Sequence, residues 1–351
     1  MRLILFPFSL IFAGIVSFRN FLFDRGIIKS VSYSLPVISV GNITVGGTGK
    51  TPMSEYILNI LSNDFRCALL SRGYGRKTKG VLLADNQSIY TDIGDEPMQI
   101  KAKFKNILVA VAEKRNAGME MLLKLPNPPE IVILDDAYQH RYIKPGLSIL
   151  VIDYNRPVWK DFILPAGNLR GPSKNVKRAD IVVINKCPNH LSEKAADNIK
   201  NRLKLSDYQH IYFTSIRYLE PVSMNEDKNM DFSLILKNND NHIVAVAGIG
   251  NPKPFFEMAG SIAKLDKKVR FRDHYQYKLT DITKIIDKCI IKNKSHPILL
   301  TTEKDAVRMK KIPEIFHNFG HLIWYFPIEL EFLFGEKDKF DNEIDKYVRR
   351  N

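Results

Sequence analysis

The sequence predicts an α/β protein: a phosphate-loop (P-loop) domain with a parallel sheet flanked by helices, a smaller α/β C-terminal domain, and an N-terminal membrane-associating helix. Three observations predict it. Short apolar runs alternate with helical or loop stretches. A glycine-rich loop stands between the first such run and a helical segment. The first 18 residues are almost wholly apolar.

The apolar N-terminal run, Leu3 to Phe18, is shorter than the about 20 residues of a membrane span and contains Pro7. A signal peptide, a short span and a helix that dips into one leaflet all fit it, as does a buried first helix. We favour the leaflet helix. The glycine-rich loop that follows is a nucleotide-binding loop, and because ATP is cytosolic this argues against secretion. Its interfacial aromatic residues would be Phe6, Phe8, Phe12, Phe18, Phe21 and Phe23.

The apolar runs predict strands in two series. The first series is Pro36–Val40, Cys67–Leu70, Ile107–Val111, Ile131–Leu134, Ile149–Ile152 and Ile181–Ile184. Met53–Leu61 between the first two has helical spacing. The second series has strands at Ile243–Ala247, Val269–Phe271 and Ile298–Thr301, helices at Pro254–Ala263 and Thr280–Ile291, and a further apolar run at Leu322–Phe326. A polar stretch separates the series, which gives a helix at 1–25, a P-loop domain at 26–220, a linker at 221–241 and a C-terminal domain at 242–351.

The composition is that of a globular protein, with 45% hydrophobic and 26% charged residues. The net charge of +14 suits an anionic partner, which could be nucleic acid, a phosphorylated substrate or an acidic membrane surface. A generally lysine-rich proteome would also give this charge. The three cysteines are far apart and form no CxxC pair, which argues against a disulfide framework or a zinc site and favours a reducing compartment.

The phosphate loop lies within Gly41–Pro52, and its binding residues are Thr44, Val45, Gly46, Gly47, Thr48, Gly49, Lys50 and Thr51. Its backbone N–H groups and the following helix N-terminus would bind phosphate oxygens. Lys50 would bridge the β- and γ-phosphates of ATP, and Thr51 would bind Mg²⁺. Thr44 stands where the usual pattern has glycine. The loop also resembles that of membrane-partitioning and arsenical-pump ATPases, but Val45 replaces their signature lysine, which counts against such an ATPase.

Two carboxylates, Asp135 and Asp136, follow the strand predicted at Ile131–Leu134. At the carboxyl edge of the sheet Asp135 would hold Mg²⁺ directly or through water, and Asp136 would orient a water or the substrate. An exposed strand end is the alternative interpretation.

Four further segments carry charge at turns. Asp95 and Glu96 lie in Gly94–Pro97, where Asp95 could instead cap a helix. Asp273 and His274 form a pair that is structural in most proteins. Arg72 and Arg76 could clamp a phosphate or lie in a solvated turn. Thr302–Asp305 reads as a solvated helix start.

Taken together and in this order, the segments resemble the tetraacyldisaccharide 4′-kinase family of the lipid A pathway of Gram-negative bacteria. The resemblance is carried by the aromatic N-terminal helix and by VGNITVGGTGKTP, LLSRGYGR, GDEP, ILDDAYQH, LPAGNLR, RADIVVINK, DHY and TTEKDAVR. It covers nearly the whole chain. The resemblance implies a P-loop kinase domain that uses ATP and Mg²⁺.

The implied reaction is transfer of the γ-phosphate to the 4′-hydroxyl of a tetraacyldisaccharide 1-phosphate, giving lipid IVA. In the family the aspartate of the GDEP segment is the base and is paired with the histidine of the DH segment; here these are Asp95 and His274. Lys50 completes the catalytic set. The metal would be held by Thr51, Asp135 and Asp136, and substrate contacts would come from Arg72, Arg76 and Glu96. Gly171 stands where the family typically has glutamate before proline, which puts any role of that carboxylate in doubt.

The expected partners are a lipid disaccharide and the membrane surface, at the cytoplasmic face of the bacterial inner membrane. No protein partner is predicted. A membrane-bound switch ATPase or GTPase is the main rival; Pro188 stands where a guanine-reading NKxD motif after Asn185 and Lys186 needs aspartate. A nucleic-acid-binding protein ranks last, because no recognition helix, finger or RNA-binding aromatic signature is present.

Overall fold

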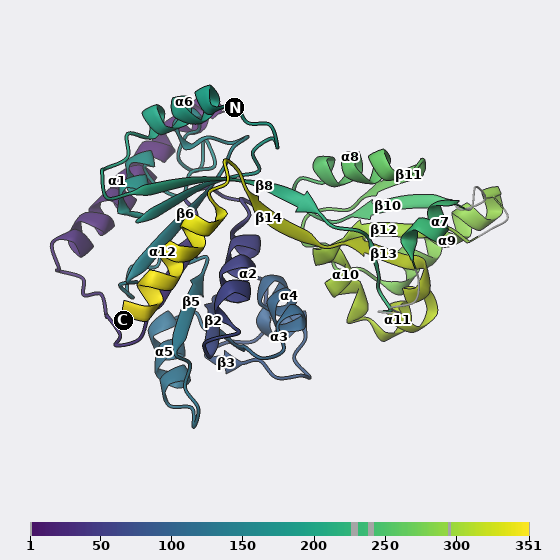
Figure 1. Ribbon diagram of the computed structural model, residues 1–351, viewed down its shortest axis with the longest axis horizontal. Helices are drawn as coiled ribbons and strands as arrows, with labels where there is room; N and C mark the ends of the chain where they lie inside the picture. The colour runs from purple at the N-terminus through teal and green to yellow at the C-terminus, as the bar shows by residue number, and fades with distance from the viewer. Residues whose placement is uncertain (1, 226–230, 238–241, 294–295, 351) are drawn as a thin grey trace. The chain divides into compact units, whose positions relative to one another are not determined.

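The computed structural model describes residues 2–225, 231–237, 242–293 and 296–350. The chain forms two compact units (Figure 1). The first unit consists of Met1–Ile216 and Leu330–Asn351, and the second of Arg217–Glu329.

The first unit is built on one sheet with the strand order β14-β8-β7-β6-β1-β5-β2-β4-β3. The strands are β1 (Val37–Gly41), β2 (Cys67–Ser71), β3 (Leu82–Leu83), β4 (Leu108–Val111), β5 (Ile131–Asp135), β6 (Leu147–Asp153), β7 (Ile181–Asn185), β8 (His210–Tyr218) and β14 (Ile328–Phe332). Strand β1 is paired in parallel with β5 and β6. The pairs β2–β5, β2–β4, β6–β7 and β7–β8 are parallel too, and β3 runs antiparallel to β4. The predicted parallel sheet is confirmed.

Helices cover both faces of this sheet (Figure 1). The α-helices of this unit besides α1 (Arg2–Asp24) are α2 (Lys50–Leu61), α3 (Tyr90–Ile93), α4 (Asp95–Lys103), α5 (Arg115–Leu123), α6 (Glu193–Leu203) and α12 (Lys337–Arg350). Helices α5 and α6 pack on the face that carries Leu134 and Leu150. On the other face α2 and α12 meet through the rings of Tyr56 and Phe340, whose centroids are 5.8 Å apart. The strands β1, β2, β5, β6 and β7 are buried along their whole length, which explains the continuous apolar runs in the sequence.

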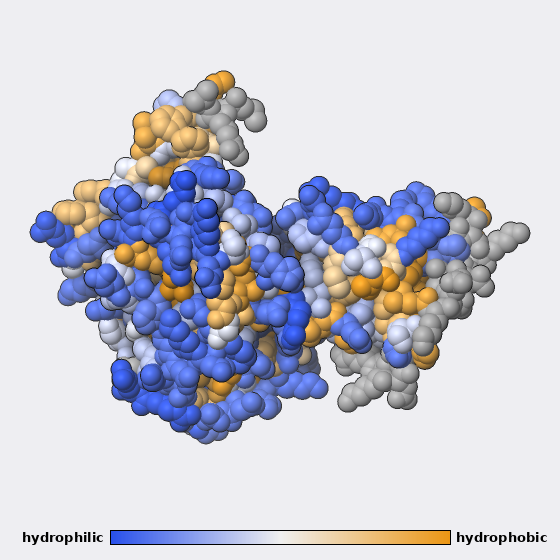
Figure 2. Space-filling view, turned by 45° about the horizontal axis from the view of Figure 1, so that its top comes forward, coloured by the Kyte–Doolittle hydropathy of each residue, from blue (hydrophilic) through white to orange (hydrophobic). Residues whose placement is uncertain are grey.

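Helix α1 (Arg2–Asp24) leaves most of its apolar surface uncovered, and Figure 2 shows hydrophobic residues gathered on it. Only 6% of its most apolar window is buried, so the alternative of a buried first helix is wrong. Within the described residues α1 is the one helix whose length and composition would suffice to cross a membrane. Ser9 anchors it, because its hydroxyl donates to the Ile163 carbonyl at 2.8 Å and accepts from the Ala166 N–H at 2.9 Å.

The C-terminal tail does not follow the predicted domain boundary. Residues 330–351 were predicted within a C-terminal domain at 242–351, but they join the first unit. Helix α12 buries Phe340, Ile344 and Val348 there, and the Tyr347 hydroxyl bonds the backbone N–H and carbonyl of Val37 at 3.0 and 3.1 Å. Tyr347 and Val37 are 310 positions apart in the sequence, so no local sequence pattern could predict this contact.

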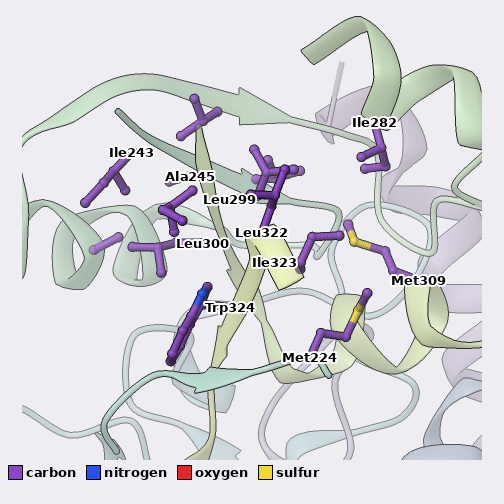
Figure 3. Packing of buried hydrophobic residues seen from close by; sticks show 14 of the residues in the cluster. Met224, Ile243, Ala245, Ile282, Leu299, Leu300, Met309, Leu322, Ile323 and Trp324 are labelled. Carbon is purple, nitrogen blue, oxygen red and sulfur yellow. The ribbon is translucent and has the colours of Figure 1, made fainter. Parts of the chain in front are cut away.

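The second unit has a five-stranded sheet in the order β11-β10-β12-β13-β9. Its strands are β9 (Val222–Ser223), β10 (Ile243–Ala247), β11 (Leu265–Arg270), β12 (Ile298–Thr302) and β13 (Ile323–Phe326), and its helices are α7 (Phe232–Lys237), α8 (Lys253–Ile262), α9 (Leu279–Asn293), α10 (Glu303–Lys310) and α11 (Pro313–Phe319). Figure 3 shows its core, in which Leu299, Ile323 and Trp324 pack with Met224 and Met309. Part of the predicted linker is therefore structured, since β9 pairs with β13; its residues 226–230 and 238–241 lie outside the described part of the chain.

Candidate active site

The phosphate loop joins β1 to α2, as predicted. Gly46 and Gly49 have φ of +92° and +100°, a region that side-chain-bearing residues rarely adopt. Gly49 also lies against Asn185: a Cβ on Gly49 would fall 1.8 Å from the Asn185 amide nitrogen. This position therefore requires glycine for two independent reasons.

Side chains that follow or end β1, β6 and β7 hold the phosphate loop in place. The Asn185 amide donates to the Thr48 carbonyl at 3.0 Å, and the Asn42 amide donates to the Thr48 hydroxyl at 3.0 Å. Lys186 donates to the Gly47 carbonyl and pairs with Asp153 at 2.9 Å. The Asn-Lys pair thus supports the phosphate loop in this protein. Sequence reasoning weighed it only as a guanine-reading motif.

Lys50 lies at the start of α2 and is almost fully buried. Its ammonium is 3.6 Å from a carboxylate oxygen of Asp136, at the end of β5. Arg170 contacts both Asp136 oxygens, at 3.1 and 3.2 Å. The structure therefore brings Lys50 together with Asp136 of the predicted acidic pair. It also places Arg170 there, a residue of the LPAGNLR segment to which the sequence analysis gave no role of its own.

Asp135 is completely buried at the same sheet edge. The Ser54 hydroxyl donates to its Oδ1 at 2.9 Å. Burial raises the pKa of Asp135, and the charges of Glu96 and Asp136 raise it further, while Lys50 and Ser54 act in the opposite direction. Among the described residues, the Asp135 Oδ2 has no hydrogen-bond partner although it is buried.

These features fit a divalent cation. The unpartnered buried oxygen of Asp135 would give Mg²⁺ one protein ligand, and the ion would neutralise the charge that Glu96 and Asp136 add there. Thr51, another of the three predicted ligands, is buried in the first turn of α2.

Asp95 and Glu96 occupy the first turn of α4. The cap position belongs to Gly94, so the interpretation of Asp95 as the capping residue is wrong. Gly94 lies against the loop after β2, because a Cβ on it would fall 2.8 Å from the Tyr74 carbonyl oxygen. The GDEP and SRGYG segments are thus in contact, and the charge of Glu96 acts on Asp135.

The two candidate substrate arginines differ in their surroundings. Arg72 is exposed. The Arg76 side chain is only 3% exposed, and its guanidinium donates to Glu113 at 2.5 Å and to the Gly80 carbonyl at 2.6 Å. Arg76 therefore holds its own loop together, so the solvated-turn alternative is wrong for this residue.

Two further residues near this site were missed by sequence reasoning. Arg115, in α5, is buried, and this burial lowers its pKa to about 10 despite the opposing charges of Asp135 and Asp136. Burial and the charges of Arg115, Arg19 and Arg72 lower the pKa of His140 to about 4, so its imidazole is neutral at physiological pH. The ILDDAYQH segment contains His140, but nothing in the sequence indicated that arginines surround it.

Gly171 has a local explanation. A Cβ at this position would fall 2.9 Å from the Asn175 amide nitrogen and 3.2 Å from Val16 Cγ1 in α1. The glutamate of the resembling family would therefore need these neighbours to shift.

In the second unit, His274 has φ of +54°, and its Nε2 is 3.9 Å from Asp273 Oδ1. The segment predicted as a solvated helix start is instead buried in part. Thr302 caps α10 by accepting from the Asp305 N–H, and Asp305 is fully buried. Asp305 can be buried because its carboxylate pairs with the Arg308 guanidinium, one helical turn away, at 2.9 Å.

The parallel sheet, the phosphate loop after its central strand and the buried carboxylates at the same edge define a P-loop phosphotransferase. A family profile described as tetraacyldisaccharide-1-P 4′-kinase matches residues 1–349. The chain belongs to this family.

Individual relatives agree along the whole length. The chain is 41% identical to a tetraacyldisaccharide 4′-kinase of Bacteroides thetaiotaomicron over 356 residues, covering 99% of this chain and 93% of the relative. It is 42% identical to that of Flavobacterium johnsoniae over 351 residues, covering 100% and 98%. The fold is similar to a crystal structure of LpxK from Aquifex aeolicus in complex with ATP, with a TM-score of 0.77, 28% identity and 99% of each chain covered.

Proposed function

We propose that this protein is a tetraacyldisaccharide 4′-kinase, which transfers the γ-phosphate of ATP to the 4′-hydroxyl of tetraacyldisaccharide 1-phosphate and yields lipid IVA and ADP. The observation that carries the proposal is the phosphate loop with Lys50 paired to Asp136 and the buried carboxylate Asp135 next to it in the chain, in a sequence that belongs to this family from end to end. The first unit is the kinase domain of this proposal.

The nucleotide lies on the phosphate loop. Backbone N–H groups from Gly46 to Thr51 and the N-terminus of α2 bind the phosphates, and Lys50 bridges the β- and γ-phosphates. The Val45 N–H takes no part, because it donates to the Asn168 carbonyl at 2.8 Å. Thr51, Asp135 and Asp136 would hold Mg²⁺, which supplies charge neutralisation on the phosphates when it is bound. Asp136 already faces Lys50 and Arg170, so Asp135 is the stronger ligand candidate of the pair.

Asp95 is the proposed base. It accepts the proton of the 4′-hydroxyl as that oxygen bonds to the γ-phosphorus and the bond to the β-phosphate oxygen breaks. The resemblance pairs Asp95 with His274, and Glu96 is proposed to contact the sugar. Arg72 is the stronger candidate for binding the 1-phosphate, because it is exposed in the loop that Gly94 contacts. Arg76 is the weaker candidate, because its charge is already paired with Glu113.

The membrane is the proposed location of the substrate. The apolar face of α1 would enter one leaflet of the inner membrane from its cytoplasmic side, where ATP is available. Exposed side chains such as Phe8, Ile11 and Phe18 would contact the acyl region, and the net charge of +14 favours an anionic surface.

The test is transfer of labelled γ-phosphate from ATP to tetraacyldisaccharide 1-phosphate in detergent micelles. We expect label in the lipid with the wild type, and a loss of about 100-fold or more in kcat for Asp95→Ala with ATP affinity retained. Lys50→Ala should weaken both turnover and ATP binding. Label appearing only as free phosphate would favour the switch ATPase and overturn the proposal.

A further inference from the structure

The second unit contains a buried ion pair that reaches the proposed catalytic histidine. Asp305 is fully buried, and Arg308 has a side chain that is 3% exposed. Both belong to the TTEKDAVR segment, to which the proposed function assigns no role. Burying two charges is costly unless their remaining polar atoms are well satisfied.

Hydrogen bonds fix the carboxylate of this pair in place. Asp305 Oδ2 accepts from the Gly248 N–H at 2.9 Å and from the Thr302 hydroxyl at 2.8 Å. Its Oδ1 accepts from Arg308 Nη1 at 2.9 Å. The carboxylate is thus tied to the end of β10 and to the cap of α10.

The two terminal nitrogens of Arg308 have different partners. Nη1, which binds Asp305, also binds a backbone carbonyl, and Nη2 contacts the histidine. Arg308 Nη1 also donates to the Gly248 carbonyl at 3.1 Å, which leaves its planar guanidinium little freedom to rotate. Arg308 Nη2 lies 3.3 Å from His274 Nδ1. A guanidinium can only donate, so Nδ1 must be the acceptor in this contact.

The consequence concerns the histidine proton. An imidazole whose Nδ1 accepts a hydrogen bond carries its single proton on Nε2 when neutral. Nε2 is the ring atom that faces Asp273, at 3.9 Å. The backbone of His274 is held in a left-handed conformation, so the loop itself is constrained at this residue.

We infer that Arg308, anchored by Asp305, is a positioning residue of the kinase: it holds the His274 ring in one orientation and in the Nε2–H tautomer. This inference rests on the proposed function, in which His274 takes part in the transfer. A solvated ion pair would stabilise α10 alone, whereas the fork of Arg308 joins α10 to the loop of His274.

Arg308→Lys is the variant of choice. It keeps a positive charge beside the buried Asp305 but replaces the fork by one nitrogen, which cannot reproduce both contacts. Arg217→Lys is the matched control, because Arg217 forms an exposed guanidinium–carboxylate pair with Glu329 in the same unit. Melting temperatures of all variants are measured alongside.

The kinetic arm uses a double-mutant cycle with His274→Ala. We expect Arg308→Lys to lower kcat by about 10-fold with KM for ATP and lipid unchanged, and Arg217→Lys to leave both unchanged. In the His274→Ala background Arg308→Lys should change kcat by less than about 2-fold, because its effect acts through the absent ring. An equal loss in both backgrounds would show a purely structural role and overturn the inference.

The spectroscopic arm does not depend on activity. With ¹⁵N-labelled histidine, and His274→Ala to assign the signal, the wild-type imidazole should show the Nε2–H tautomer, and Arg308→Lys should give a mixture. An Nδ1–H tautomer in the wild type, or an unchanged signal in Arg308→Lys, would overturn the inference. If His274→Ala were fully active while the tautomer still shifted, the assignment of His274 to the reaction would fail and Arg308 would still be shown to orient the ring.

Discussion

Asp135 is the residue whose surroundings most clearly favour function over stability. It is ionisable, fully buried and close to other carboxylates, so burial raises its pKa. A folded-state pKa above the unfolded value means that the folded protein binds the proton more tightly. This carboxyl therefore contributes stability at low pH, and that contribution is lost as the pH rises through its folded pKa.

Asp135→Asn should raise the melting temperature of the nucleotide-free, Mg²⁺-free protein at pH 8 by about 2 °C or more, because it removes a buried charge of nearly the same shape. The gain should shrink at pH 5, and MgATP should stabilise the variant less than the wild type. Calorimetry at both pH values checks this. Asp153→Asn is the control: Asp153 is paired with Arg156 and Lys186, so its neutralisation should lower the melting temperature. An unchanged or lower value for Asp135→Asn at pH 8 would contradict the account.

Gly49 offers a second test at the residue scale. Gly49→Ala forces a side chain into a φ of +100° and against Asn185, and should cost about 1–3 kcal/mol of unfolding free energy. Gly47→Ala, in the same loop, is the control, because a Cβ there has no neighbour within 4 Å. Urea unfolding of both variants is the measurement. Equal stabilities would mean that the loop relaxes around Asn185.

At the scale of elements, α1 is attached by few polar contacts and presents an apolar face. Ser9, Arg19 and Arg141 tie it to the first unit, with the Arg19 guanidinium donating to the Gln139 carbonyl and Arg141 to the Asn20 carbonyl. The exposed apolar residues of α1, such as Ile11 and Ile15, are not among these contacts. Substituting them should therefore affect membrane binding and leave folding intact.

Ile11→Asp and Ile15→Asp should each weaken binding to vesicles of anionic phospholipid by about 10-fold or more, because a charge replaces apolar surface that enters the bilayer. Both residues are more than 60% exposed, so the melting temperature should not change. Ile291→Asp, an exposed apolar residue of α9, is the matched control. Co-sedimentation with vesicles decides; undiminished binding of both α1 variants would exclude α1 as the membrane contact.

At the scale of the whole molecule, the chain leaves the first unit after Ile216 and returns to it at Leu330. The returning tail supplies Phe332 and Phe340, whose rings pack with Tyr56 and Tyr212. The second unit is thus an insertion between two parts of the first, and the fold of the kinase domain depends on the last residues of the chain.

A chain ending at Glu329 should therefore lose ATP binding, because the face that α12 covers would be exposed. Tyr347→Phe in the full-length chain should have a milder effect and lower the free energy of unfolding by about 1 kcal/mol, since it removes only the hydroxyl that bonds Val37. Titration with a fluorescent ATP analogue and urea unfolding measure the two effects. Wild-type ATP affinity in the shortened chain would refute the dependence.

The sequence by itself determined the features that depend on residues close together in the chain. The glycines of the phosphate loop, the apolar runs of the parallel strands and the apolar composition of α1 follow from local conformation and hydrophobic pattern. The ordered motifs were enough for the family. Asp135, Lys50 and Thr51 became candidates because strand-end carboxylates and phosphate-loop residues occur at fixed positions relative to their elements.

Only the tertiary structure decided which polar groups meet. Arg170 reaches Asp136 across 34 residues, Asn185 reaches Thr48 across 137, and Arg308 reaches His274 across 34. It also showed that Arg76 is occupied by Glu113 and that α12 belongs to the first unit. The physical reason is the same in each case: strand order and the close approach of loops set these distances, and neither is encoded in the spacing along the chain.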